Sequence, residues 1–170
     1  MRKLKTAVSV ANILERELEP TIKDWLLRVN LAPALTKVPL SDADRTAHLP
    51  KLYFDLILRL AKHAAAPISF TAAAHGKLRY AQGYSADMLI EESRLFLVAT
   101  FGALHLHRSE LDQGQVRLDV KAIADEVDAQ LAESVRTFMG AKVAESVAHH
   151  TFRTPAAVAV AYPYPRLVGL

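Results

Sequence analysis

Residues 75–85 of this chain read His75-Gly76-Lys77-Leu78-Arg79-Tyr80-Ala81-Gln82-Gly83-Tyr84-Ser85. This stretch predicts the end of one helix and the start of another. Gly83 stands where a helix ends in a left-handed backbone, which glycine adopts without strain. Ser85 follows as an N-cap, because its hydroxyl can accept from the free N–H groups of a first helical turn. We therefore expect two helices to meet at a tight corner.

The polar side chains of this stretch fall on one helix face. His75, Arg79 and Gln82 lie at positions i, i+4 and i+7. Glu91 and Glu92 lie two turns into the next helix, near enough for one of them to meet Arg79. Two interpretations stay open: a clasp that fixes the corner angle, or a sensing or ligand pocket. A catalytic site is not expected, because no nucleophile–base pair accompanies these residues.

The rest of the chain also has the apolar spacing of helices. In residues 7–30 this spacing includes Pro20, which either kinks a helix or lies in the first turn of a second one. Residues 31–40 hold two prolines and predict a loop. Ser41 is a plausible cap for the helix that follows. Further helices are predicted at 50–65, 69–82 and 86–108, so we expect an all-α bundle.

A long last helix is predicted to begin near Asp119. Its apolar residues alternate at steps of three and four: Val120, Ile123, Val127, Leu131, Val135 and Phe138. Such a stripe is typical of a helix-bundle dimer, but also of an ordinary core helix, and the spacing favours neither. The aromatic residues at helical positions are expected in the core: Trp25, Phe54, Phe96 and Phe101.

Composition narrows the class of protein. The 170 residues suit one domain with an appendage, and 51% apolar with 23% charged residues indicates a folded core. The net charge of +3 is scattered, so no nucleic-acid partner is expected. The chain has no cysteine, which excludes disulfides and fits a reducing compartment such as the cytoplasm. Its longest uncharged stretches are well short of the ~20 residues that span a bilayer, so no membrane partner is expected.

The remaining histidines do not predict a metal site. His105 and His107 point about 200° apart on a helix, so they cannot hold one ion together. The adjacent His149 and His150 diverge likewise, and His48 stands alone in the sequence. We expect neither a metal nor another cofactor.

The end of the last helix carries a second pattern. His150 is followed by Arg153, Thr154 and Pro155 at +3, +4 and +5, which resembles the phosphoacceptor box of sensor histidine kinases. Thr151 stands where that box has an acidic residue, and Thr cannot act as a general base at neutral pH. The chain stops at residue 170, without room for an ATP-binding domain. We therefore interpret the segment as a truncated phosphoacceptor-like tail.

The corner itself resembles the N-terminal domain of RsbR-type stressosome proteins, which also precedes some bacterial histidine kinases. The matching positions are His75, Gly76, Arg79, Gln82, Gly83, Tyr84, Ser85 and Glu92. The helix start His48-Leu49-Pro50-Lys51-Leu52 fits the same family. The resemblance covers about residues 8–148. It implies a globin-like helical input domain that dimerises, carries no haem and relays a signal to whatever follows it.

These observations predict a signal-input domain at residues 1–148 and a phosphoacceptor-like tail at 149–170. A long C-terminal connector helix would link them. The expected function is regulation in a two-component or stressosome-like system, without catalysis, with a second copy and a downstream signalling protein or kinase domain as partners. One alternative is a phosphorelay component that a partner kinase phosphorylates on His150. A more distant one is a small-molecule binding protein with a pocket near His75 and Arg79.

Overall fold

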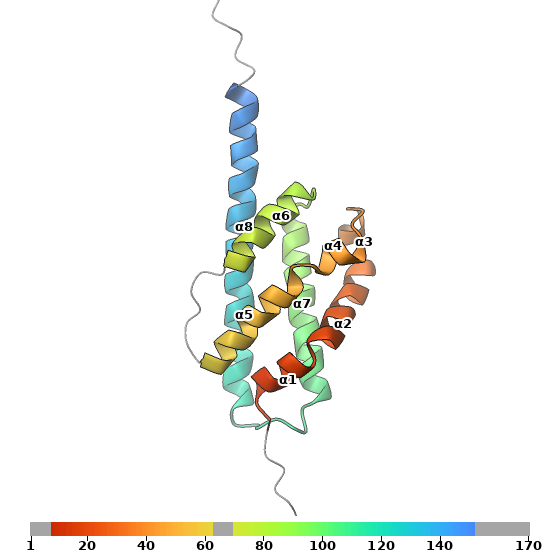
Figure 1. Cartoon of the computed structure of the whole chain (residues 1–170), viewed down its shortest axis with the longest axis vertical. Helices are drawn as coiled ribbons and strands as arrows, with labels where there is room; N and C mark the ends of the chain where they lie inside the picture. The colour runs from red at the N-terminus through yellow and green to blue at the C-terminus, as the bar shows by residue number, and fades with distance from the viewer. Residues whose placement is uncertain (1–7, 63–69, 152–170) are drawn as a thin grey trace, which may run out of the picture.

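The computed structural model describes residues 8–62 and 70–151. Within them the chain is all-α, and the only β-type pairing is an isolated bridge between Val8 and Leu111. The helices are α1 (Val10–Arg16), α2 (Leu18–Asn30), α3 (Pro33–Thr36), α4 (Asp42–Thr46), α5 (Leu49–Lys62), α6 (Phe70–Ala81), α7 (Ala86–Leu106) and α8 (Val116–Thr151). Figure 1 shows α8 along one side of the bundle, with its last turns extending beyond the other helices. No helix in the described ranges is long and apolar enough to cross a membrane.

The N-terminal helices follow their prolines and caps. Pro20 lies in the first turn of α2, where its missing N–H costs no hydrogen bond. Ser41 caps α4, accepting a hydrogen bond of 3.1 Å from the backbone N–H of Asp44. The prediction of a loop over residues 31–40 was wrong in part, because α3 occupies its middle. Pro33 is the first residue of that helix and has its backbone angle preset.

The long helix begins at Val116, three residues before the predicted start. The turn before it is held by the side chain of Asp112, which accepts from the Gly114 N–H at 2.7 Å. The apolar stripe of α8 faces the core of this same chain: Ile123 and Phe138 are fully buried. The core-helix interpretation of the stripe is thus the one that the structure supports. Val120, at 39% exposure, lies outside that core.

Helix α6 packs closely along α8. A Cβ atom at Gly76 would overlap with the carbonyl oxygen of Ser134 and the hydroxyl of Thr137. The Ser134 hydroxyl donates to the carbonyl of Ala72 at 2.9 Å, and the Thr137 hydroxyl donates to that of Ala73 at 3.0 Å. Glycine at position 76 therefore permits the contact between the two helices, and two hydroxyls fix its register.

The core lies between α1, α2, α5, α7 and the first half of α8. Its largest apolar members include Trp25, Leu49, Tyr53, Leu56, Leu89 and Phe96. The expectation that Phe54 is a core residue was wrong, because its side chain is 62% exposed on the outer side of α5. Phe101 is partly buried against the core.

Candidate functional site

The corner between α6 and α7 is built as the sequence predicts. Gly83 has a φ of 83°, in the left-handed region. Its N–H donates to the carbonyl of Tyr80, and the next N–H, of Tyr84, donates to the carbonyl of Arg79, both at 3.0 Å. These two bonds satisfy the last carbonyls of α6. Ser85 stands at the N-cap of α7, although its hydroxyl does not bond a backbone N–H of that helix.

Arg79 is the centre of this corner and is fully buried. It donates to the two carboxylate oxygens of Glu92 at 3.1 and 2.5 Å. Its other N–H groups donate to the side-chain oxygen of Gln82 at 2.7 Å and to the carbonyls of Arg45 and Asp44 at 2.8 and 3.4 Å. All five guanidinium protons thus have acceptors. The clasp interpretation holds for Arg79, which ties α6 to α7 and to α4.

A second buried arginine extends the clasp, and sequence reasoning missed it. Arg45 donates to the carbonyl of Val38 at 2.7 Å, to that of Leu35 at 3.3 Å and to the Tyr84 hydroxyl at 3.4 Å. The Tyr84 ring lies 4.7 Å under the Arg79 guanidinium, in cation–π contact. Burial, and next the charge of the neighbouring carboxylate, raise the pKa of Tyr84. The Tyr84 hydroxyl therefore stays protonated at neutral pH.

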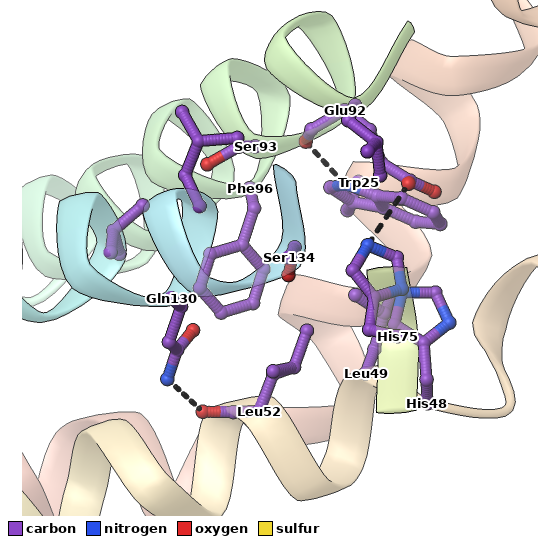
Figure 2. A pocket seen from close by; sticks show the side chains of 13 residues that line it. Trp25, His48, Leu49, Leu52, His75, Glu92, Ser93, Phe96, Gln130 and Ser134 are labelled. Carbon is purple, nitrogen blue, oxygen red and sulfur yellow. Dashed lines mark hydrogen bonds and ion pairs between the residues drawn. The ribbon is translucent and has the colours of Figure 1, made fainter. Parts of the chain in front are cut away.

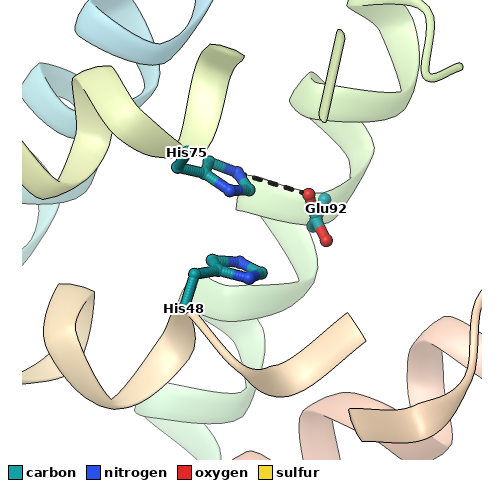
Figure 3. Close-up of side chains that lie close together, drawn as sticks. All are labelled: His48, His75 and Glu92. Atoms are coloured by element: carbon teal, nitrogen blue, oxygen red, sulfur yellow. Dashed lines mark ion pairs between the residues drawn. The ribbon is translucent and has the colours of Figure 1, made fainter. Parts of the chain in front are cut away.

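Two histidines lie stacked beside the clasp (Figure 3). The rings of His48 and His75 are 4.1 Å apart at their centres and inclined by 16°. His75 Nε2 lies 3.4 Å from a carboxylate oxygen of Glu92, and His48 Nδ1 lies 3.4 Å from Arg79. Burial, followed by the neighbouring His75 and Arg79, lowers the pKa of His48 well below its ordinary value. The His48 ring is therefore neutral under physiological conditions.

The interpretation of His48 as an isolated residue was wrong. It precedes α5, whereas His75 lies in the middle of α6, and packing of the two helices brings the rings together. The signal in the sequence was a polar residue directly before the apolar helix start Leu49-Pro50. The other nitrogen of each ring, His48 Nε2 and His75 Nδ1, is buried and has no hydrogen-bond partner among the described residues.

Both rings line a cavity of about 30 Å³ (Figure 2). Its walls are largely apolar and include Trp25, Leu52 and Phe96. Helix α8 closes one side with Gln130 and Ser134, whose side chains bond backbone carbonyls of α5 and α6. Arg79 does not line the cavity. Of the two residues expected at a pocket, only His75 borders the cavity, together with His48. All hydrogen-bond donors of Arg79 are already used within the protein.

His48, His75 and Glu92 form a group of possible metal ligands whose nitrogen and oxygen atoms lie within 4.8 Å of one another. The charges around this group decide whether it suits an ion. The buried charges of the corner are already Arg45 and Arg79 against the single Glu92. A dication would add to this excess positive charge in a poorly solvated place.

The remaining predicted residues lie apart from the cavity. Glu91 pairs with Arg94 on the surface, not with Arg79. His150 is exposed near the end of α8, with Nδ1 3.1 Å from the Ser146 carbonyl. The side chain of Thr151 and residues 152–155 of the phosphoacceptor-like pattern lie outside the described residues.

No protein-family model matches the chain, and no curated protein or solved structure matches it either. The resemblances to RsbR-type input domains and to a phosphoacceptor box stay predictions.

Proposed function

We propose that this chain is the regulatory input module of a bacterial signal-transduction protein of the two-component or stressosome-like type. It works in the cytoplasm, has no catalysis of its own and has a globin-like arrangement of helices. The observation that carries the proposal is the position of α8. This helix forms a wall of the histidine-lined cavity and then continues, with residues 142–150 exposed, beyond the bundle (Figure 1).

The route from cavity to helix end is short. Gln130 and Ser134 of α8 line the cavity, and Ser134 is hydrogen-bonded to α6 one turn away from His75. The close contact at Gly76 and the hydrogen bonds from Ser134 and Thr137 to carbonyls of α6 tie α8 to that helix. A change of shape in the cavity is therefore expected to shift α8 as a rigid body, since packed interfaces respond in steps and do not deform continuously.

The exposed part of α8 offers a surface for partners. Met139, Val143 and Val147 recur every four residues along it and are 44%, 59% and 60% exposed. Residues spaced in this way form one apolar face of a helix. We assign this face to a second copy of the chain, so that the paired α8 helices pass the signal to a downstream signalling protein or kinase domain.

Spin labels provide the test of the coupling. The chain has no cysteine, so Lys51→Cys on α5 and Lys142→Cys on α8 accept one nitroxide each. Ser93→Leu fills the cavity from α7 without altering α8. Double electron–electron resonance should then show a changed distance distribution between the labels.

The matched control is Ser109→Leu, the same substitution at an exposed position. It should leave the distribution unchanged. A folded Ser93→Leu protein whose distribution equals that of wild type would remove the proposed coupling.

The alternative of a phosphorelay component is favoured by one observation. His150 is exposed, and its Nδ1 lies 3.1 Å from a backbone carbonyl, a contact that in the neutral ring favours a proton on Nδ1 and a lone pair on Nε2. A neutral imidazole with that lone pair can act as a nucleophile. Incubation with labelled ATP and a partner kinase should give acid-labile label in wild type and none in His150→Ala. Equal labelling of the two proteins would remove this alternative.

A further inference from the structure

The neighbours of the two stacked rings decide where their protons lie. A carboxylate only accepts hydrogen bonds, so the Nε2 that His75 points at Glu92 carries a proton. A guanidinium only donates, so the Nδ1 that His48 turns to Arg79 carries a lone pair. In the neutral form of each ring, the state of the other nitrogen follows from this. His48 Nε2 carries an N–H, and His75 Nδ1 carries a lone pair.

The two atoms without partners are therefore complementary. One is a donor and the other an acceptor, both are buried, and both belong to rings that line the same cavity. Buried polar atoms in folded proteins nearly always have a hydrogen-bond partner. A group that accepts one hydrogen bond and donates another can satisfy both at once.

We propose that the cavity binds a small neutral molecule through a hydroxyl or primary amide group, which accepts from His48 Nε2 and donates to His75 Nδ1. A volume of about 30 Å³ has room for roughly two or three water-sized groups. The apolar side chains of Leu52, Phe96 and Leu131 form the wall against which a short alkyl part would lie. This inference rests on the proposed function, for which such a molecule is the stimulus.

The same arrangement argues against charged ligands. An anion would face the lone pair of His75, and a metal ion would need lone pairs on both ring nitrogens. The metal ion would also meet the excess of buried arginine charge. A ligand without charge avoids each of these costs.

The test uses the 170-residue chain with ¹⁵N-labelled histidine and four probes. Ethanol and formamide both accept and donate, acetonitrile only accepts, and Zn²⁺ tests the metal alternative. Ethanol and formamide should shift the ring nitrogen signals of His48 and His75 saturably, with Kd on the order of millimolar for so few atoms. Acetonitrile should bind about tenfold more weakly, since it lacks one hydrogen bond. The exposed His105 provides an internal signal that should not move.

Two variants complete the test. His75→Phe keeps a ring of similar size but removes the acceptor, and should weaken ethanol binding by about tenfold. His105→Phe should bind as wild type does. Shifts that grow linearly without saturation, as for a site that holds only water, would overturn the inference. Equal binding by His75→Phe, saturable binding of Zn²⁺ or a proton on His75 Nδ1 in the unliganded spectrum would also overturn it.

The outcome separates this inference from the proposed function. Failure of every probe to bind, with the Ser93→Leu effect on the label distance intact, would remove the ligand class and keep the input module. Saturable binding of a probe that leaves the label distance unchanged would keep the ligand class and remove the input module.

Discussion

Arg79 and His75 lie one turn apart on the same face of α6, both are buried, and both contact Glu92. They differ in whether a hydrogen-bonding group remains available for a ligand. Every guanidinium proton of Arg79 meets an acceptor, and the acceptors on Glu92, Asp44 and Arg45 belong to other helices. His75 lines the cavity and uses one ring nitrogen, while its other nitrogen has no hydrogen-bond partner among the described residues.

The difference separates two roles within one polar cluster. Arg79 uses all its hydrogen-bond donors to hold the backbone, Gln82 and Glu92, so no donor remains for a ligand. Its loss should therefore lower the free energy of unfolding. His75 adds little to stability, because one of its ring nitrogens is buried without a hydrogen-bond partner among the described residues. Binding should therefore depend on the histidine and folding on the arginine.

The largest expected effect is that of Arg79→Met. It removes one partner of a buried ion pair and leaves Glu92 without compensation, which should lower the free energy of unfolding by about 3–5 kcal/mol. Urea denaturation followed by circular dichroism measures it. Arg94→Met, which breaks the exposed pair with Glu91, should leave the urea midpoint close to that of wild type. Similar losses in the two variants would end the distinction between clasp and surface pair.

Gly76→Ala should come next. The added methyl group would overlap with Ser134 and Thr137 on α8, so the helices must move apart, at a cost of about 1–3 kcal/mol. Gly140→Ala is the matched control, because no atom lies within 4 Å of a Cβ there. That change should stabilise α8 by up to about 1 kcal/mol. Thermal unfolding of both variants gives the comparison, and a Gly76→Ala protein as stable as wild type would contradict the close packing of α6 on α8.

Acidification should destabilise the protein through His48. Its pKa is lowered in the folded state but near 6.5 in the unfolded chain, so the unfolded chain binds more protons as the pH falls below about 7. Stability should fall by up to about 1.4 kcal/mol per pH unit below pH 6.5, until the pH reaches the folded pKa. Urea midpoints between pH 7.5 and 5 should show this slope in wild type and a shallower one in His48→Gln.

Carboxylates with lowered pKa values do not interfere in that range. The hydrogen bond from Arg16, and next that from His107, lower the pKa of Glu110 to about 2. The contribution of Glu110 is therefore lost only below about pH 4.5. An identical pH slope in wild type and His48→Gln would show that His48 is not a buried neutral base.

The smallest expected effect is that of His75→Phe. A ring of similar size replaces the histidine, the long contact to Glu92 is lost and a buried atom without a partner disappears. We expect a change in the free energy of unfolding within about 1 kcal/mol. Differential scanning calorimetry beside Arg79→Met checks this. A loss as large as that of the arginine variant would make the histidine part of the clasp.

The local part of this site could be predicted from the sequence. Helical spacing fixes the common face of His75, Arg79 and Gln82, and Gly83 fixes the turn that brings α7 back. An ion pair of Arg79 with one of Glu91 and Glu92 follows from those two facts. The choice between Glu91 and Glu92 does not, because it depends on how α7 is rotated against α6.

Residues that reach the corner from elsewhere could not be predicted. Arg45 lies in the polar stretch Asp42-Ala43-Asp44-Arg45 and has the pattern of a surface residue, yet it is buried. Its partners are the backbone carbonyls of Leu35 and Val38, which have no signature in side-chain sequence. His48 is buried by contacts between helices that are distant in the chain. Apolar periodicity also misplaced Phe54, because it locates a face of α5 only to within about one residue.

The uneven support of α8 has a mechanical consequence. The helix is held at Ser134 and Thr137, and fourteen residues after Thr137, at 1.5 Å each, its described end at Thr151 lies about 21 Å away. Such an arm magnifies small rotations about its fulcrum. A tilt of roughly 5°, within what a rearranged side chain in the cavity wall could cause, would swing the tip by about 1.8 Å. That displacement is close to the distance between the hydrogen and the acceptor atom of a hydrogen bond. It is large enough to change which groups meet on two neighbouring α8 helices.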